Sequence, residues 1–136
     1  MQEPTVLLIE DNPDDIALAR RAITRRKVGA RLEVATSGRE AVEMLHRPDH
    51  GLPRAVFLDV NMPEWNGFEV LRRLRAEDRT RLLPVVMLTT SSEPGDIALG
   101  YRLGANSYVA KPLDFEEFTE IFAAMTRYWT RVNEVS

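Results

Sequence analysis

The stretch AVFLD at residues 55–59 places four apolar residues directly before an aspartate. The stretch VLLIED at residues 6–11 has the same form, with four apolar residues followed by Glu10 and Asp11. A third apolar run, PVVML at residues 84–88, ends at Thr89. Short apolar runs without polar alternation are typical of strands buried on both faces of a parallel sheet. The three runs therefore predict the centre of such a sheet, with polar side chains at its carboxyl edge.

Helical segments separate these runs. Apolar residues recur at helical spacing in residues 14–27, 37–45, 68–76 and 94–103, and in a last segment from the cap Asp114 to about Val132. Two weaker strands, at residues 31–35 and 107–110, complete a series of five strand-then-helix units. Such alternation implies right-handed crossovers and helices on both faces of the sheet. We therefore predict an α/β fold: a doubly wound, five-stranded parallel sheet of flavodoxin-like type in a three-layer sandwich, with strand order 2-1-3-4-5.

Length and composition narrow the class of protein. The chain of 136 residues and 15.5 kDa is predicted to be a single domain with its core at about residues 5–125 and no output domain. A net charge of −3 argues against direct nucleic-acid binding, and the uncharged runs are too short for a membrane span. The chain has no cysteine and residues 1–5 do not resemble a leader, so we expect a cytoplasmic protein.

Three carboxylates, those of Glu10, Asp11 and Asp59, follow two of the predicted buried strands. Each of them alone could be a solvated acid at a strand end. Together in one crevice they would repel one another unless a cation neutralised them. Mg²⁺ suits this set because it takes oxygen ligands, keeps several waters and shares its coordination with a phosphate. The sequence therefore predicts a metal site.

A lysine and a threonine follow two other strands of the same sheet. Lys111 offers a compact charge that can reach a phosphoryl oxygen, although an ion pair with a neighbouring carboxylate is an equally natural role. Thr89 could supply a hydroxyl to the same group. Metal, ammonium and hydroxyl would then surround a transferring phosphoryl group, and Asp59 is the candidate nucleophile.

Five groups of residues, in order along the chain, resemble the signature of two-component response-regulator receiver domains (CheY-like). They are Glu10-Asp11, FLDVNMP at residues 57–63, Gly67, LTT at residues 88–90 and YVAKP at residues 108–112. The resemblance implies that Asp59 accepts a phosphoryl group from a sensor histidine kinase. It also implies that Glu10, Asp11 and Asp59 hold Mg²⁺ or Mn²⁺, together with the backbone carbonyl of Asn61.

The same resemblance assigns further roles. Lys111 would bind the phosphoryl group, with a Lys111–Pro112 bond that is commonly cis, and Thr89 and Tyr108 would be the switch residues. Asn61 and Ser91 would tune how fast water removes the phosphoryl group. The protein would then be no enzyme but a phosphoacceptor that catalyses only its own phosphorylation and dephosphorylation. Its signal would be a change at the surface formed by the fourth helix, the fifth strand and the fifth helix.

The last helical segment is long for this sheet. About 19 residues span roughly 28 Å as a helix, whereas a five-residue strand spans roughly 17 Å. We therefore expect its end to overhang and to form a homodimer through four apolar side chains, those of Ile121, Tyr128, Trp129 and Val132. The aromatic tail and residues 104–109 also resemble stand-alone regulators paired with bacterial phytochrome kinases, which implies a bacteriophytochrome as the partner kinase.

The same residues allow other interpretations. A flavodoxin-like redox carrier would share the fold, but residues 10–15 present four acids where a flavin phosphate would lie. An aspartyl-phosphate phosphatase would share the chemistry, but its second acid would fall on Asn61. A receiver that never takes phosphate stays open. The basic residues at positions 20–31 are interpreted as a solvated helix face, with kinase docking as the alternative, and Trp65 as a surface contact.

Overall fold

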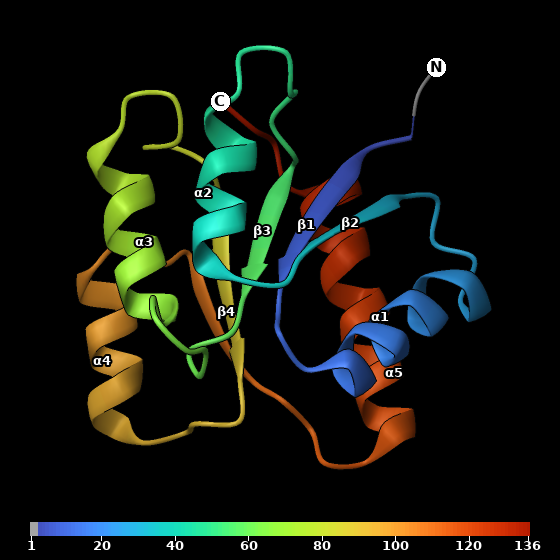
Figure 1. Ribbon diagram of the computed structural model, residues 1–136. Helices are drawn as coiled ribbons and strands as arrows, with labels where there is room; N and C mark the ends of the chain where they lie inside the picture. Colours follow the sequence, from blue (N-terminus) through green and yellow to red (C-terminus); the bar gives the residue numbers. More distant parts are fainter. Residues whose placement is uncertain (1–2) are drawn as a thin grey trace.

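The computed structural model describes residues 3–136 of the chain. A parallel sheet with strand order β2-β1-β3-β4-β5 forms its centre, and helices cover both faces (Figure 1). This confirms the predicted doubly wound fold and its strand order. The strands are β1 (Thr5–Ile9), β2 (Arg31–Ala35), β3 (Ala55–Leu58), β4 (Val85–Thr89) and β5 (Ser107–Ala110).

The helices follow the predicted segments closely. α1 ends two residues before the predicted limit, because Arg26 caps the helix and Lys27 adopts a left-handed φ of 52° that turns the chain toward β2. No helix in residues 3–136 is long and apolar enough to cross a membrane. The helices are α1 (Pro13–Arg25), α2 (Gly38–His46), α3 (Gly67–Ala76), α4 (Pro94–Arg102) and α5 (Phe115–Arg127).

Each face of the sheet carries its own apolar layer. Successive strand residues point to opposite faces, so Phe57 packs with α1 and α5 whereas Leu58 packs with α2 and α3. The ring of Phe122 in α5 meets that of Phe57 edge to face at 5.4 Å between centroids. Because both layers bury the strands, the carboxyl ends of β1, β3 and β4 are held at one edge of a rigid sheet.

The end of the last helix does not overhang as expected. Its final turn, Tyr128–Val132, is a π-helix that packs back on the molecule. Trp129 contacts the apolar layer beneath α5, and the guanidiniums of Arg127 and Arg131 donate to backbone carbonyls of the α1–β2 loop. That loop therefore supplies hydrogen-bond acceptors for the last turn, which a comparison of helix and strand lengths leaves out. Tyr128 and Val132 remain exposed, at 47% and 66%.

Candidate functional site

The three predicted acids lie together at the carboxyl edge of the sheet. Glu10 and Asp11 follow β1, Asp59 follows the neighbouring β3, and one carboxylate oxygen from each lies within 4.8 Å of the others. Glu10 and Asp59 are only 1% and 6% exposed, whereas Asp11 is exposed. Burial raises the pKa of Glu10 to about 7, against the opposing effect of Lys111. This all-oxygen, acidic donor set fits a hard divalent cation.

Lys111 brings one positive charge to these acids. Its Nζ lies 2.5 Å from Glu10 Oε1, 2.7 Å from Asp15 Oδ2 and 3.6 Å from Asp59 Oδ2. Burial by itself lowers the pKa of Lys111, but hydrogen bonds to Asp15 and Glu10 and the charge of Asp59 outweigh it, so the pKa is raised. The ion pair that the sequence suggested for Lys111 is therefore present, beside the candidate nucleophile. The Lys111–Pro112 bond is trans, contrary to the expectation from resemblance, since residues 3–136 contain no cis peptide.

Asp15 was missed in the sequence. It lies in the first turn of α1, where an acid is ordinarily explained by the helix dipole. Its partner Lys111 is 96 residues away, so only the tertiary structure, in which α1 packs beside α5, reveals the contact. Its place in the sequence, four residues after the candidate metal ligand Asp11, was the one signal that Asp15 could belong to the site.

Thr89 and Tyr108 are linked through Ser91. Thr89 ends β4 fully buried, and its hydroxyl accepts a long hydrogen bond of 3.4 Å from the Ser91 amide. The Tyr108 hydroxyl donates to the Ser91 carbonyl at 2.8 Å, and Ser91 Oγ donates to Asp96 Oδ2 at 2.5 Å. Burial raises the pKa of Tyr108. The candidate switch residues thus form one connected group that reaches the start of α4, and Asp96 was not foreseen in it.

The β3–α3 loop, residues 59–66, carries Asn61. The Asn61 amide donates to Asp59 Oδ1 at 3.3 Å, and its side chain reaches Thr90 Oγ1 at 3.5 Å. Gly67 closes the loop: a Cβ there would lie 2.3 Å from the Asp59 carbonyl oxygen. Only glycine allows α3 to start this close to the backbone of Asp59, which explains its place in the motif.

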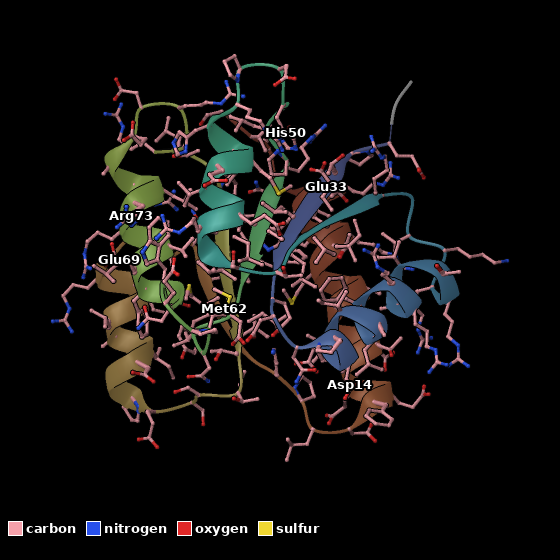
Figure 2. All side chains as sticks on the ribbon, in the orientation of Figure 1. Asp14, Glu33, His50, Met62, Glu69 and Arg73 are labelled. Atoms are coloured by element: carbon pink, nitrogen blue, oxygen red, sulfur yellow. The ribbon has the colours of Figure 1, made fainter. Side chains whose placement is uncertain are left out.

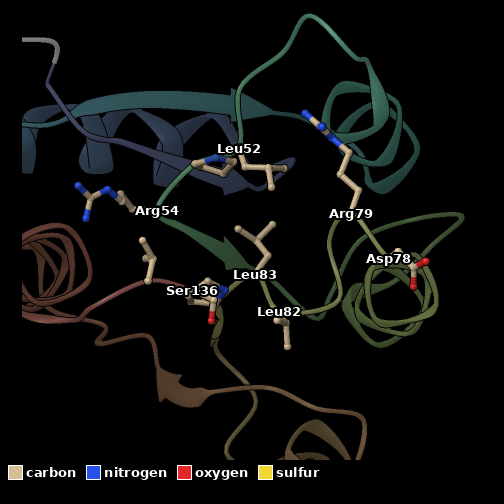
Figure 3. A pocket seen from close by; sticks show the side chains of 10 residues that line it. Leu52, Arg54, Asp78, Arg79, Leu82, Leu83 and Ser136 are labelled. Atoms are coloured by element: carbon tan, nitrogen blue, oxygen red, sulfur yellow. The ribbon is translucent and has the colours of Figure 1, made fainter.

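One surface hollow lies away from these residues. It is lined by Leu52 and Arg54 before β3, by Leu82 and Leu83 before β4, and by Ser136 (Figure 3). These residues precede the strands, whereas the acids follow them. The hollow and the acid cluster therefore lie at opposite edges of the sheet.

Comparison with known proteins points to one family. The family described as "Response regulator receiver domain" matches residues 6–123. The probable methanogenesis regulatory protein FilR2 of Methanothrix harundinacea is 37% identical over 127 residues, which are 91% of this chain and 82% of FilR2. The chain spans only 24%, 51% and 45% of three further curated relatives.

Solved structures agree in fold and extent. The phosphorylated cyanobacterial phytochrome response regulator RcpA superposes with a TM-score of 0.90 at 27% identity, covering 99% of both chains. RPA3017, a response regulator in red light signalling of R. palustris, gives 0.87 at 28% identity and 98% coverage of both chains. The sheet order, the acid cluster and the lysine are thus found in a chain that resembles such regulators along nearly its whole length.

Proposed function

This chain is a member of the response regulator receiver family, whose domains act in signalling. We propose that it is a stand-alone phosphoacceptor in a two-component phosphorelay. Asp59 receives the phosphoryl group from a phosphohistidine of a sensor histidine kinase. The observation that supports this most is the position of Asp59: it is buried between two further carboxylates and the ammonium of Lys111.

The transfer is an in-line displacement. A carboxylate oxygen of Asp59 bonds to phosphorus while the bond from phosphorus to the kinase imidazole nitrogen breaks, and that nitrogen takes a proton from water. Lys111 then exchanges part of its contact with Glu10 and Asp15 for a phosphoryl oxygen. Glu10, Asp11, Asp59 and the Asn61 carbonyl would hold Mg²⁺, or Mn²⁺ in its place, which neutralises charge on the transferring group.

Phosphorylation changes the positions of the linked residues Thr89, Ser91 and Tyr108. Thr89 moves its hydroxyl toward the phosphoryl group, and Tyr108 follows because its hydroxyl is bonded to the adjacent Ser91. The surface that changes includes α4, β5 and α5. Asn61 and Ser91 border the group and tune its hydrolysis. Beyond its own phosphorylation and dephosphorylation the protein catalyses nothing.

We propose a bacteriophytochrome as the kinase and the cytoplasm as the compartment. The support is the similarity to RcpA and RPA3017, and the absence of cysteine from the sequence. We also propose a homodimer through the end of the last helix, where Tyr128 and Val132 are exposed and Ile121 and Trp129 are half-buried beside them. A monomer mass by light scattering at micromolar concentration would exclude the dimer.

Phosphorylation by a small donor tests the central proposal. The full chain is incubated with labelled acetyl phosphate and Mg²⁺, beside the variants Asp59→Asn and Asp14→Asn. Asp14 is a matched control, because it is an exposed acid of the same region whose carboxylate makes no contact with Lys111. We expect label in the wild type and in Asp14→Asn, and none in Asp59→Asn. Equal label in all three would refute the assignment.

A further inference from the structure

Trp65 lies between two arginines at the far end of the β3–α3 loop. Arg73 of α3 places its Cζ 3.7 Å from the centroid of the indole ring, and Arg39 of α2 places its Cζ at 4.4 Å. The ring is half-buried and packs on the apolar layer between the sheet and these helices. It is therefore more than the surface contact suggested by the sequence: it joins the loop to two helices.

Both cations are themselves held in place. Arg39 Nε lies 2.7 Å from Glu64 Oε1, and Arg73 Nε lies 2.9 Å from Glu69 Oε2. Figure 2 shows Arg73 and Glu69 together on α3, with Met62 of the loop below them. Glu64 adopts a left-handed φ of 67°, which is unfavourable for a residue with a side chain, so neighbouring contacts must hold this turn. The arginine–tryptophan stack and the Arg39–Glu64 pair supply those contacts.

The other end of the same loop carries the candidate metal ligands. Asp59 begins it, and Asn61, whose carbonyl is the ligand assigned in the proposed function, comes two residues later. The loop closes on itself, because the Gly67 amide donates to the Val60 carbonyl at 3.0 Å. A short, hydrogen-bonded segment therefore connects Trp65 with Asn61.

We propose that Trp65 is a positioning residue for metal binding. By stacking between Arg39 and Arg73, it holds the loop that carries the Asn61 carbonyl in one conformation before the ion arrives. Binding then does not have to order the loop, and a preordered site binds more tightly. This inference rests on the proposed function, because it takes the Asn61 carbonyl as a ligand. We expect loss of the stack to weaken Mg²⁺ binding about tenfold, equivalent to about 1.4 kcal/mol.

Titration calorimetry with MgCl₂ on the full chain, freed of metal with EDTA, tests the proposal. The variants are Trp65→Leu, Trp65→Tyr, Arg73→Met and Arg72→Met. Tyrosine keeps an aromatic face for the cations. Arg72→Met is the matched control: it removes the same charge, and Arg72 also pairs with Glu69, but it does not stack on Trp65. Thermal unfolding in EDTA checks that each variant is folded.

The expected result is weaker binding in Trp65→Leu and Arg73→Met, with Trp65→Tyr and Arg72→Met close to the wild type. Wild-type affinity in Arg73→Met, or equal weakening in Arg72→Met, would overturn the inference and leave the proposed function standing. A wild-type chain that binds no Mg²⁺ would overturn both. Should Trp65→Leu fail to fold, Arg73→Met still decides, because its side chain is exposed.

Discussion

Arg75 holds three parts of the molecule together, and its replacement should destabilise the fold severely. Its guanidinium donates to the Gly104 carbonyl at 3.0 and 2.8 Å and to Asn106 Oδ1 at 3.0 Å. It also reaches the carbonyls of Leu83, Arg81 and Thr80 at 2.8, 3.1 and 3.3 Å. One side chain of α3 thus satisfies acceptors in both the α3–β4 and the α4–β5 loops. Burial lowers the pKa of Arg75, yet arginine remains charged.

The size of the effect follows from these contacts. Four acceptors are reached at good distance, and each bond contributes about 1 kcal/mol net, since the group is only half-buried and some donors are shared. Arg75→Met should therefore cost about 3 to 4 kcal/mol, a large part of a typical unfolding free energy of about 5–15 kcal/mol. Lysine cannot reproduce the planar fork, so Arg75→Lys should recover only a minor share.

Urea unfolding followed by circular dichroism measures this loss. In a separate thermal unfolding experiment, the melting temperature of Arg75→Met should lie about 10 °C below that of the wild type. Arg72→Met is the control on the same helix, because Arg72 is exposed and makes a single ion pair with Glu69, and its change should stay within about 0.5 kcal/mol. A loss below about 1 kcal/mol in Arg75→Met would refute the view that these bonds fix the loops.

Three further predictions concern the site. The pKa of Glu10 is raised from 4.5 to about 7 in the native state, so between these pH values the native state binds more protons than the unfolded state. The free energy of unfolding in EDTA should therefore decline as pH rises through that range. Urea unfolding at pH 5 and 7.5 should show this decline in the wild type but not in Glu10→Gln. Lys111→Met leaves the carboxylates of Glu10, Asp15 and Asp59 without their cation. Thermal unfolding should show a loss of about 3 kcal/mol in the free energy of unfolding, which Mg²⁺ partly restores. An equal loss with and without Mg²⁺ would contradict this prediction. Gly67→Ala should cost more than about 2 kcal/mol because its Cβ meets the Asp59 backbone, whereas Gly95→Ala, in open space at the start of α4, should change stability by less than about 0.5 kcal/mol, both measured by urea unfolding.

The positions of the main site residues were predictable from the chain alone. Glu10, Asp59 and Lys111 each follow a strand, Thr89 ends one, and parallel strands bring their carboxyl ends to one edge. The fold class and strand order followed from the alternation of apolar runs and helical segments, because this periodicity is a local property of the sequence. The convergence of the three carboxylates is thus determined by the sequence alone.

Contacts between distant residues were decided only by the tertiary structure. Asp15 reaches Lys111 at the sheet edge, and Arg75 reaches the α4–β5 loop, and in neither case does the sequence identify the partner. Trp129 was expected to overhang but packs on the apolar layer beneath α5, while the neighbouring Arg131 donates to the Gly29 carbonyl of the α1–β2 loop. Hydrophobic periodicity records which side of an element is buried, since burial repeats with each turn or each second residue. It does not record which loop or charge lies opposite a given side chain, because that depends on how elements far apart in the chain pack together.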